Sequence, residues 1–293
     1  MIDQFLDYLR YEKNRSPQTV ARYERSLRDF QSYFKSREER LTWASVDADV
    51  IRGWMESLMD KGNIAATVNT GLTAVRSFFR FALSRGLVGS DPARRVAGPK
   101  KRKPLPQFVK EDEMNWLLDE KEWGCDYKDV RARTILLVLY ETGLRRSELT
   151  GLNDQDVDFA AGQLKVTGKR SKQRIVPFGA EMAEQLHRYQ AIRDKMVVRL
   201  TVGAFFLDNH GRRMTGNQVY HVVRQYLTGV TTLKKRSPHV LRHSFATAML
   251  NHDAGLESVR QLLGHESLET TEVYTHTTFE QLKRVYKDAH PRG

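Results

Sequence analysis

The chain has 293 residues, and its 48 lysine and arginine residues against 36 aspartate and glutamate residues give a formal net charge of +12. This length predicts two domains, and the positive charge favours a polyanionic partner such as nucleic acid over a neutral one. The single cysteine, Cys125, excludes an internal disulfide and a zinc site built from several cysteines, and we assign it no role.

A membrane surface is the weaker alternative for the positive charge. No apolar run approaches the roughly 20 residues that a membrane-spanning helix needs. The N-terminal stretch MIDQFLDYLRYEK carries acidic and aromatic residues instead of the basic and apolar regions of a signal peptide. We therefore expect a cytoplasmic protein, located at the nucleoid if its partner is DNA.

The first 95 residues predict a helical domain. Apolar side chains recur at helical spacing, and start signals occur at Ser16-Pro17 and at Asp47 and Asp49. The expected helices cover residues 2–12, 19–34, 47–58 and 67–86. In the last of these, the expected core residues are Val75, Phe78, Phe79 and Leu83, and the arginines that face either DNA or water are Arg76, Arg80 and Arg85.

A basic segment follows this domain. Residues 1–95 hold 16 basic and 12 acidic side chains, residues 96–110 hold 5 basic and none acidic, and residues 111–293 hold 27 and 24. The segment 96–110, VAGPKKRKPLPQFVK, also contains three prolines, so we expect an extended linker. Its KKRK run is either solvated linker charge or a strap along a phosphate backbone.

Residues 111–293 predict a second, mainly helical domain with a small sheet. The apolar run RARTILLVLYETG reads as a buried helix that stops at Gly143, and LRRSELTGL reads as a short helix. Residues 156–179 alternate like two or three antiparallel strands, with turns near Gly162 and Gly168. Further helices are expected over residues 111–123, 180–196, 215–227, 238–252, 256–264 and 279–289.

Polar residues gather in TGLRRSEL, TGKRSKQR, SPHVLRHSFAT and LGHESLETTEVYTHT. In the third stretch, Ser237 is a good N-cap with Pro238 at the first helical position. His239, Arg242 and His243 then share one helix face near that N-terminus. Free backbone N–H groups, an arginine and a histidine together favour binding of an anion such as a phosphate.

The last stretch raises the question of whether Tyr274 packs or reacts. Gly264 is expected to end a helix, which leaves His265 in a turn with its ring nitrogens exposed to a ligand. The histidines do not form a recognisable zinc pattern, because HESLE is not HExxH, and no GxSxG turn supports a serine nucleophile. We therefore expect no metal and no cofactor.

Taken together, these stretches resemble the tyrosine recombinases, also called phage-type integrases, and among them the Xer branch. The resemblance covers nearly the whole chain, and the six catalytic residue types occur in family order. They are Arg145 in TGLRRSEL, Lys169 in VTGKRSKQRIVP, His239 and Arg242 in HVLR, His265 in LGH, and Tyr274 nine residues further on.

The resemblance implies a mainly α fold: a helical, SAM-like core-binding domain over residues 1–95, a basic linker over 96–110, and a catalytic domain over 111–293 with a small antiparallel sheet. The two domains are expected to form a C-shaped clamp around double-stranded DNA. The C-terminal helix is expected to dock on a neighbouring subunit, although packing on its own domain is the simple alternative.

The resemblance also implies the chemistry. Tyr274 is the expected nucleophile that becomes joined to a DNA 3′-phosphate, Lys169 the general acid and His239 the acid/base partner, with His265 a further phosphate contact. Arg145 and Arg242 can donate bidentately to oxygens of the scissile phosphate and stabilise the pentacoordinate transition state. Because a phosphotyrosyl ester conserves the energy of the broken bond, neither ATP nor a metal is required.

The expected function is site-specific recombination through a Holliday junction, with chromosome-dimer resolution at a dif-like site. The expected partners are DNA, a homo- or hetero-tetramer with a related recombinase, and a septal DNA translocase of the FtsK type. One alternative is a mobile-element integrase or DNA invertase of the same family. Another, from a different class, is a non-catalytic DNA-binding protein.

Several residues stay open at this stage. Glu148, one helical turn after Arg145, is either a surface acid or a partner that orients a catalytic arginine or histidine. Lys172 and Arg174 share the hairpin of Lys169, and either is a candidate phosphate contact. His243 and His276 have no assigned role.

Overall fold

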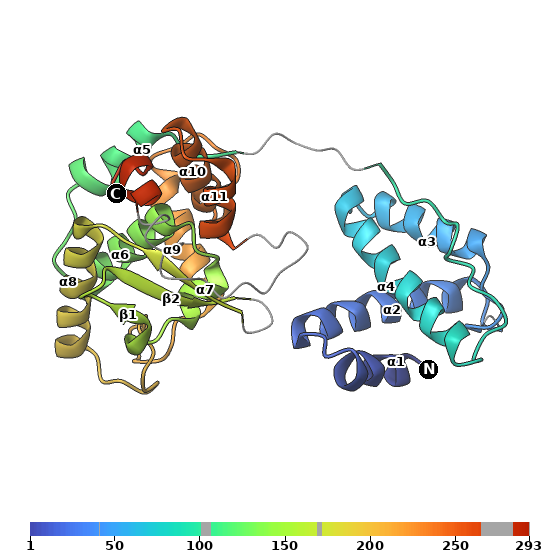
Figure 1. The fold of residues 1–293 in the computed structure, drawn as a ribbon. Helices are drawn as coiled ribbons and strands as arrows, with labels where there is room; N and C mark the ends of the chain where they lie inside the picture. The colour runs from blue at the N-terminus through green and yellow to red at the C-terminus, as the bar shows by residue number, and fades with distance from the viewer. Residues whose placement is uncertain (41, 101–106, 169–171, 265–283, 293) are drawn as a thin grey trace. The chain divides into compact units, whose positions relative to one another are not determined.

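The chain folds into two compact units, Met1–Pro104 and Leu105–Gly293. A computed structural model describes residues 1–40, 42–100, 107–168, 172–264 and 284–292 (Figure 1). The division between the units lies inside the basic segment 96–110. The finer boundaries at residues 95 and 111, and the expected DNA clamp, stay predictions.

The first unit is helical, as the periodicity predicted. Ser16 and Asp47 start two of its helices: the Ser16 hydroxyl accepts from the Thr19 amide, and the Asp47 carboxylate accepts from the amides of Asp49 and Val50. In chain order the elements are α1 (Ile2–Asp7), the π-helical turn η1 (Tyr8–Glu12), α2 (Pro17–Arg37), α3 (Ala48–Asp60) and α4 (Ala65–Ser84).

Aromatic rings form the centre of this unit. Phe30 and Phe34 of α2 pack edge-on against Trp43. The centroid of the Trp43 ring lies 4.3 Å from the ring centroid of Phe78 on α4. The indole N–H of Trp54 donates to a carboxylate oxygen of Asp29 at 2.8 Å, so this large ring is buried without losing its hydrogen bond.

Two expectations for α4 need correction. Val75, Phe78 and Phe79 are fully buried as predicted, but Leu83 is 44% exposed because it lies in the last helical turn, past the core. Arg76 is half-buried instead of fully exposed: its guanidinium donates to the carbonyls of Ala93 and Val96 and holds the following segment against α4.

The second unit is mainly helical with a three-stranded sheet, which confirms the predicted fold class. Its elements up to the sheet are α5 (Glu111–Asn115), η2 (Trp116–Glu120), α6 (Tyr127–Thr142), α7 (Arg146–Gly151), η3 (Asp154–Asp156), β1 (Val157–Asp158), β2 (Gln163–Thr167) and β3 (Gln173–Pro177). The helices that follow are α8 (Ala180–Met196), α9 (Gly216–Thr228), α10 (Pro238–Asn251) and α11 (Leu256–Leu263).

The sheet is antiparallel with the order β1-β2-β3. Its register pairs Val166 with Arg174 and Thr167 with Gln173, next to the β2–β3 turn. Gly168 closes that turn by donating its amide to the Lys172 carbonyl at 2.7 Å. Arg174 is therefore held close to Gly168, the residue that precedes Lys169 in the chain.

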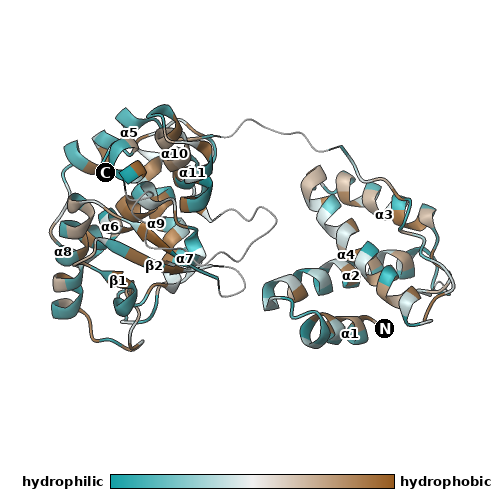
Figure 2. Ribbon diagram, viewed as in Figure 1, coloured by the Kyte–Doolittle hydropathy of each residue, from teal (hydrophilic) through white to brown (hydrophobic). Residues whose placement is uncertain are grey.

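Helix α6 is the centre of the second unit. Almost every one of its residues is buried, and it packs against α8, α9 and α10. The strands and α9 carry hydrophobic colour, whereas α5 and α8 are largely hydrophilic on the side shown (Figure 2). The predicted buried helix is thus confirmed, including its end at Gly143.

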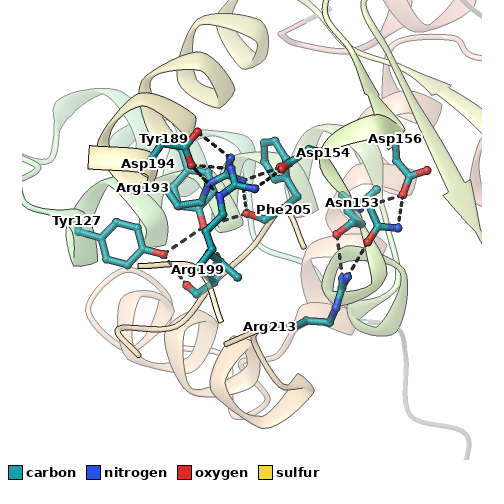
Figure 3. A network of polar contacts seen from close by, with 12 residues as sticks. Tyr127, Asn153, Asp154, Asp156, Tyr189, Arg193, Asp194, Arg199, Phe205 and Arg213 are labelled. Atoms are coloured by element: carbon teal, nitrogen blue, oxygen red, sulfur yellow. Dashed lines mark hydrogen bonds and ion pairs between the residues drawn. The ribbon is translucent and has the colours of Figure 1, made fainter. Parts of the chain in front are cut away.

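A buried arginine ties α8 to the start of the sheet (Figure 3). Arg193 is fully buried, and its Nη1 donates to Asp154 at 2.8 Å and to the Phe205 carbonyl at 2.7 Å, while its Nε donates to Asp194. The buried guanidinium charge of Arg193 is tolerated because its hydrogen bonds to two carboxylates and a carbonyl replace the hydrogen bonds it would make with water.

The C-terminal residues 284–289 are helical and pack on their own unit. Tyr286 is buried in a cluster with Phe245 and Leu263, and its hydroxyl donates to Glu141 at 3.3 Å. Arg292 binds both carboxylate oxygens of Glu181, at 2.8 and 2.7 Å. In this single chain the C-terminal helix therefore packs on its own domain. Its docking on a neighbouring subunit stays a prediction.

Within the described residues, no helix combines the length and the apolar character that crossing a membrane requires.

Gly143 ends α6 and lets the chain turn toward Leu144 and Arg145. It ends the helix with a φ of +59°, and a Cβ built there would lie 2.6 Å from Phe245 and 2.8 Å from Leu263. These distances are far shorter than a carbon contact allows, so only glycine fits between α6, α10 and α11.

We predict that Gly143→Ala lowers the free energy of unfolding of the full chain by about 1–3 kcal/mol, because it adds both a left-handed strain and a clash. Thermal and denaturant unfolding measure this. Gly151→Ala is the matched control, since its Cβ meets no heavy atom within 4 Å, and it should leave stability unchanged or slightly raised. Equal effects of the two substitutions would contradict the steric account.

Candidate active site

Arg145 is the N-cap of α7 and directly follows Gly143 and Leu144. Its side chain is 36% exposed, and its Nη2 donates to the Gly264 carbonyl at 3.1 Å. The neighbouring Arg146 is exposed and lies against α9, where a Cβ on Gly216 would meet its Nε at 2.9 Å. The two arginines of the doubled motif therefore point to different neighbours, and only Arg145 joins the end of α11.

Arg242 lies on α10 with 7% of its surface exposed. Its Nη1 donates to the Gly143 carbonyl at 2.7 Å, and its Nη2 donates to the Leu263 carbonyl at 2.6 Å. Both candidate phosphate-binding arginines thus bind carbonyls at the C-terminal end of α11, Arg242 that of Leu263 and Arg145 that of the C-cap Gly264. Three segments that are distant in sequence meet at one place because of these bonds.

Glu148 is the carboxylate at this meeting point, and only 2% of its side chain is exposed. One oxygen accepts from Arg145 Nη1 at 2.6 Å and the other from the Arg145 backbone amide at 2.8 Å. Arg174 donates to both oxygens, at 3.0 and 2.9 Å. Of the two readings of Glu148 that the sequence left open, a partner that orients Arg145 is the correct one.

Arg174 connects the sheet to the same cluster. It is buried, and besides its two bonds to Glu148 its Nε donates to the Leu262 carbonyl at 2.9 Å. A Cβ on Gly264, where φ is +62°, would lie 3.2 Å from this guanidinium. Protein groups already bind the Arg174 guanidinium, which gives this residue a structural role. A phosphate contact by Arg174 stays a prediction.

The electrostatics of Glu148 follow from these neighbours. Burial alone would raise the pKa of its carboxyl group, but the hydrogen bonds and charges of Arg174 and Arg145 outweigh burial and lower the pKa to about 2. Glu148 is thus ionised at neutral pH. Its charge offsets part of the repulsion among the three arginines.

Burial and the neighbouring positive charges lower the pKa values of Arg242 and His239. Burial and the nearby Arg145 lower the pKa of Arg242 to about 10, which still leaves it protonated at neutral pH. Burial and the charges of Arg242, His243 and Arg146 lower the pKa of His239 below its usual value. His239 is therefore neutral at neutral pH, with a ring nitrogen that can accept a proton.

Ser237 is the N-cap of α10 with Pro238 at the first helical position, as predicted. Within the described residues, however, its hydroxyl makes no side-chain capping bond. His239 and His243 are exposed on the first turns of α10, whereas Arg242 is buried. The predicted shared face is therefore divided, with the arginine turned into the protein and the histidines toward solvent.

Lys169, His265 and Tyr274 lie outside the described residues, as does His276. Two chain neighbours of these residues are described. A Cβ on Gly168, the residue before Lys169, would lie 3.5 Å from a Glu148 oxygen, and Gly264, the residue before His265, accepts from Arg145. Lys169 and His265 therefore follow, in the chain, two glycines that lie beside Glu148 and Arg145.

A metal site receives no support from the part of the chain that the structure describes. Among those residues, no three His, Cys, Asp or Glu side chains form a group that could hold a metal ion.

Comparison with known proteins decides the family. Residues 107–281 match the phage integrase family, and residues 2–86 match the phage integrase N-terminal SAM-like domain. The chain belongs to the phage integrase family of tyrosine recombinases. Among its curated relatives, a tyrosine recombinase XerC from Pelotomaculum thermopropionicum is 39% identical and matches 100% of this chain and 98% of its own. A tyrosine recombinase XerD from Oceanobacillus iheyensis is 36% identical with the same coverage.

Solved structures share the fold. A XerH site-specific recombinase bound to a palindromic difH substrate aligns with a TM-score of 0.72 at 22% identity, covering 97% of this chain and 83% of that one. A Tn1549 transposon integrase in complex with circular intermediate DNA aligns with a TM-score of 0.69 at 20% identity, covering 96% and 97%. At these identities the likeness concerns architecture alone.

We predict that Glu148→Gln lowers the free energy of unfolding by about 3 kcal/mol at pH 7, since it leaves the buried Arg174 charge without its counterion. The folded-state pKa of Glu148 is depressed, so its contribution is present above the unfolded value of 4.5 and is lost as the pH falls toward about 2. The difference between wild type and variant should therefore narrow on acidification.

Denaturant unfolding at several pH values between about 7 and 3 tests this. Glu257→Gln is the control, because Glu257 is 65% exposed in its pair with Arg260 and should cost little at any pH. A pH-independent difference for Glu148→Gln would rule out the charge as the origin of its effect.

Proposed function

We propose that this protein is a site-specific DNA recombinase that cleaves and rejoins DNA through a covalent 3′-phosphotyrosyl intermediate. The observation that carries the proposal is the pair Arg145 and Arg242, held together at the end of α11 beside an exposed His239, in a chain of the tyrosine recombinase family. Two fixed guanidinium groups provide the positive field that a phosphodiester needs to accept a nucleophile.

In this mechanism Tyr274 attacks the scissile phosphate. Its phenol has an ordinary pKa near 10, so it needs a base and a cationic surrounding as it reacts. A neutral His239 accepts the phenolic proton. Arg145 and Arg242 donate to the non-bridging oxygens as charge builds up on them, and they exchange bonds to backbone carbonyls for bonds to phosphate.

The remaining steps use the other two predicted residues. Lys169 protonates the departing 5′-oxygen, and His265 adds a contact to the phosphate. The bond from phosphorus to the 5′-oxygen breaks as the bond to the Tyr274 oxygen forms. The reverse attack by a different 5′-hydroxyl then releases Tyr274, so two rounds of exchange pass through a Holliday junction with no net energy input.

The biological role that fits best is Xer-type resolution of chromosome dimers at a dif-like site. XerC and XerD relatives that align along essentially the whole chain support this role. We further propose that the protein works in the cytoplasm at the nucleoid, as a tetramer of one or two related recombinases with a septal DNA translocase. A mobile-element integrase or invertase uses the same chemistry and is the principal alternative.

We predict that Tyr274→Phe abolishes formation of a denaturation-resistant complex with nicked dif-like DNA, because the variant lacks the attacking oxygen. Gel electrophoresis under denaturing conditions measures the complex. Tyr11→Phe is the control, since Tyr11 is 77% exposed in the first unit, and it should form the complex at the wild-type rate.

Equal yields from wild type and Tyr274→Phe would overturn the assignment of the nucleophile, and no complex from any variant would favour a non-catalytic DNA-binding protein. Deletion of the gene then separates the two recombinase roles. Loss of chromosome-dimer resolution supports the Xer role, and unaffected resolution supports a mobile element.

We predict that the rate of complex formation is flat through neutral pH and falls only below the usual histidine pKa of about 6.5, because the pKa of His239 is lowered. The fall reflects protonation of the base. His239→Asn should reduce the rate by roughly 10²–10⁴-fold and remove this acid limb. His221→Asn, at an exposed histidine on α9, should keep the wild-type rate and the fall in rate at acidic pH. An unchanged acid limb in His239→Asn would assign the base to another group.

A further inference from the structure

A buried carboxyl group near the end of α6 takes no part in the proposed reaction. Glu141 lies two residues before Gly143, and none of its surface is exposed. Its Oε2 accepts from the Tyr286 hydroxyl at 3.3 Å, and its Oε1 has no hydrogen-bond partner among the described residues. Glu148 is also buried, but two arginines bind it. Within the described residues, Glu141 lacks such a cationic partner, so burial disfavours its ionised form.

The C-terminal residues 284–292 cover this carboxyl group, and we call them the C-terminal latch. Tyr286 and His290 of the latch are buried, with their ring centroids 5.1 Å apart. The His290 ring also packs against Tyr140 of α6, at 5.7 Å, and Phe245 of α10, at 5.5 Å. The latch is closed in this arrangement, and its opening would expose Glu141 to water.

Burial governs the ionisation of Glu141. It raises the pKa of the carboxyl group to about 8, and the charge of Glu181 on α8 acts in the same direction. The groups that oppose this rise are Arg292, Tyr286 and Arg133. Under the closed latch Glu141 is therefore mainly protonated at neutral pH. Opening returns its pKa toward the ordinary value of 4.5.

His290 is a second buried titratable group of the latch. Burial lowers the pKa of its imidazole to about 3. The charges of Arg292 and His252 act in the same direction, and a backbone hydrogen bond with Tyr140 opposes them. His290 is therefore neutral in the closed latch at neutral pH. Above its ordinary pKa of 6.5 it is mainly neutral in the open latch as well.

The pH dependence of closing follows from these two groups. Closing raises the pKa of Glu141, so its contribution is full below 4.5 and is lost as the pH rises through about 8. Closing lowers the pKa of His290, so its contribution is present above 6.5 and is lost as the pH falls toward about 3. The two slopes cancel between 4.5 and 6.5, and from 6.5 to 8 the Glu141 contribution decides.

The latch lies behind the residues that hold Arg242. Tyr286 belongs to one cluster with Phe245 and Leu263, and a Cβ on Gly143 would meet those same two side chains. Arg242 donates to the carbonyls of Gly143 and Leu263. The closed latch therefore supports the packing around both carbonyls that Arg242 binds.

We infer that the C-terminal latch is proton-dependent: it closes over the protonated form of Glu141 and opens more often when this carboxyl group ionises. Closing takes up one proton from solvent, which becomes the hydroxyl hydrogen of the Glu141 carboxyl group. The inference goes beyond the proposed function and does not depend on it.

Hydrogen exchange of the full chain tests the inference, with mass spectrometry of the peptide that contains residues 284–292. The exchange rate of its amides, divided by the intrinsic rate at each pH, gives the opening equilibrium. Wild type is compared with Glu141→Gln, which has nearly the same shape and cannot ionise. Glu257→Gln is the control, because Glu257 is 65% exposed.

The latch of wild type should open roughly tenfold more often at pH 8 than at pH 6.5, because closing takes up close to one proton in this range. Glu257→Gln should show the same change. Glu141→Gln should have an opening equilibrium that is nearly constant over the range. A pH-independent wild type, or a Glu141→Gln variant that keeps the wild-type dependence, would overturn the inference.

A carbon-13 NMR titration of the Glu141 carboxyl group in wild type covers the case in which Glu141→Gln disturbs the packing. Its resonance is identified by contact with the Tyr286 ring. A midpoint well above the ordinary 4.5 is expected, and a midpoint near 4.5 would overturn the inference. Neither measurement involves DNA, so failure of the recombinase proposal and failure of this inference are distinguishable.

Discussion

The Glu148 carboxylate is the interaction on which the arrangement of the site depends. It is buried between Arg145 and Arg174, and the same arginines bind the carbonyls of Gly264 and Leu262. Without this negative charge, two guanidinium groups and that of Arg242 would repel one another at the end of α11. One carboxylate therefore holds together the turn after α6, the strand β3 and the residues that precede His265.

Glycines make this convergence sterically possible. Gly143 and Gly264 both adopt left-handed conformations, which favour glycine. A Cβ at Gly143 would clash with Phe245, and one at Gly264 would lie only 3.2 Å from the Arg174 side chain. The arginines then bind backbone carbonyls that become exposed where α6 and α11 end. Helix ends, not helix faces, thus build the site, and this explains why its residues come from short motifs spread along the chain.

The sequence was informative where a local pattern determines structure. Helical periodicity predicted α2, α4 and α6, and the strand alternation predicted the sheet. It failed at Leu83, because periodicity does not show where a helix passes beyond the core. The partnership of Glu148 with Arg174 joins residues 26 positions apart, so no local pattern reveals it. Family resemblance supplied the candidate catalytic residues, but not the carboxylate that binds Arg145 among them.

The central claim is that Tyr274 becomes covalently joined to DNA, and peptide mapping tests it most directly. The denaturation-resistant complex with nicked dif-like DNA is digested with protease and nuclease, and the modified peptide is sequenced by mass spectrometry. The account predicts one modified peptide that carries a 3′-phosphonucleotide on Tyr274. Attachment to any other residue, or a complex without covalent attachment, would contradict it.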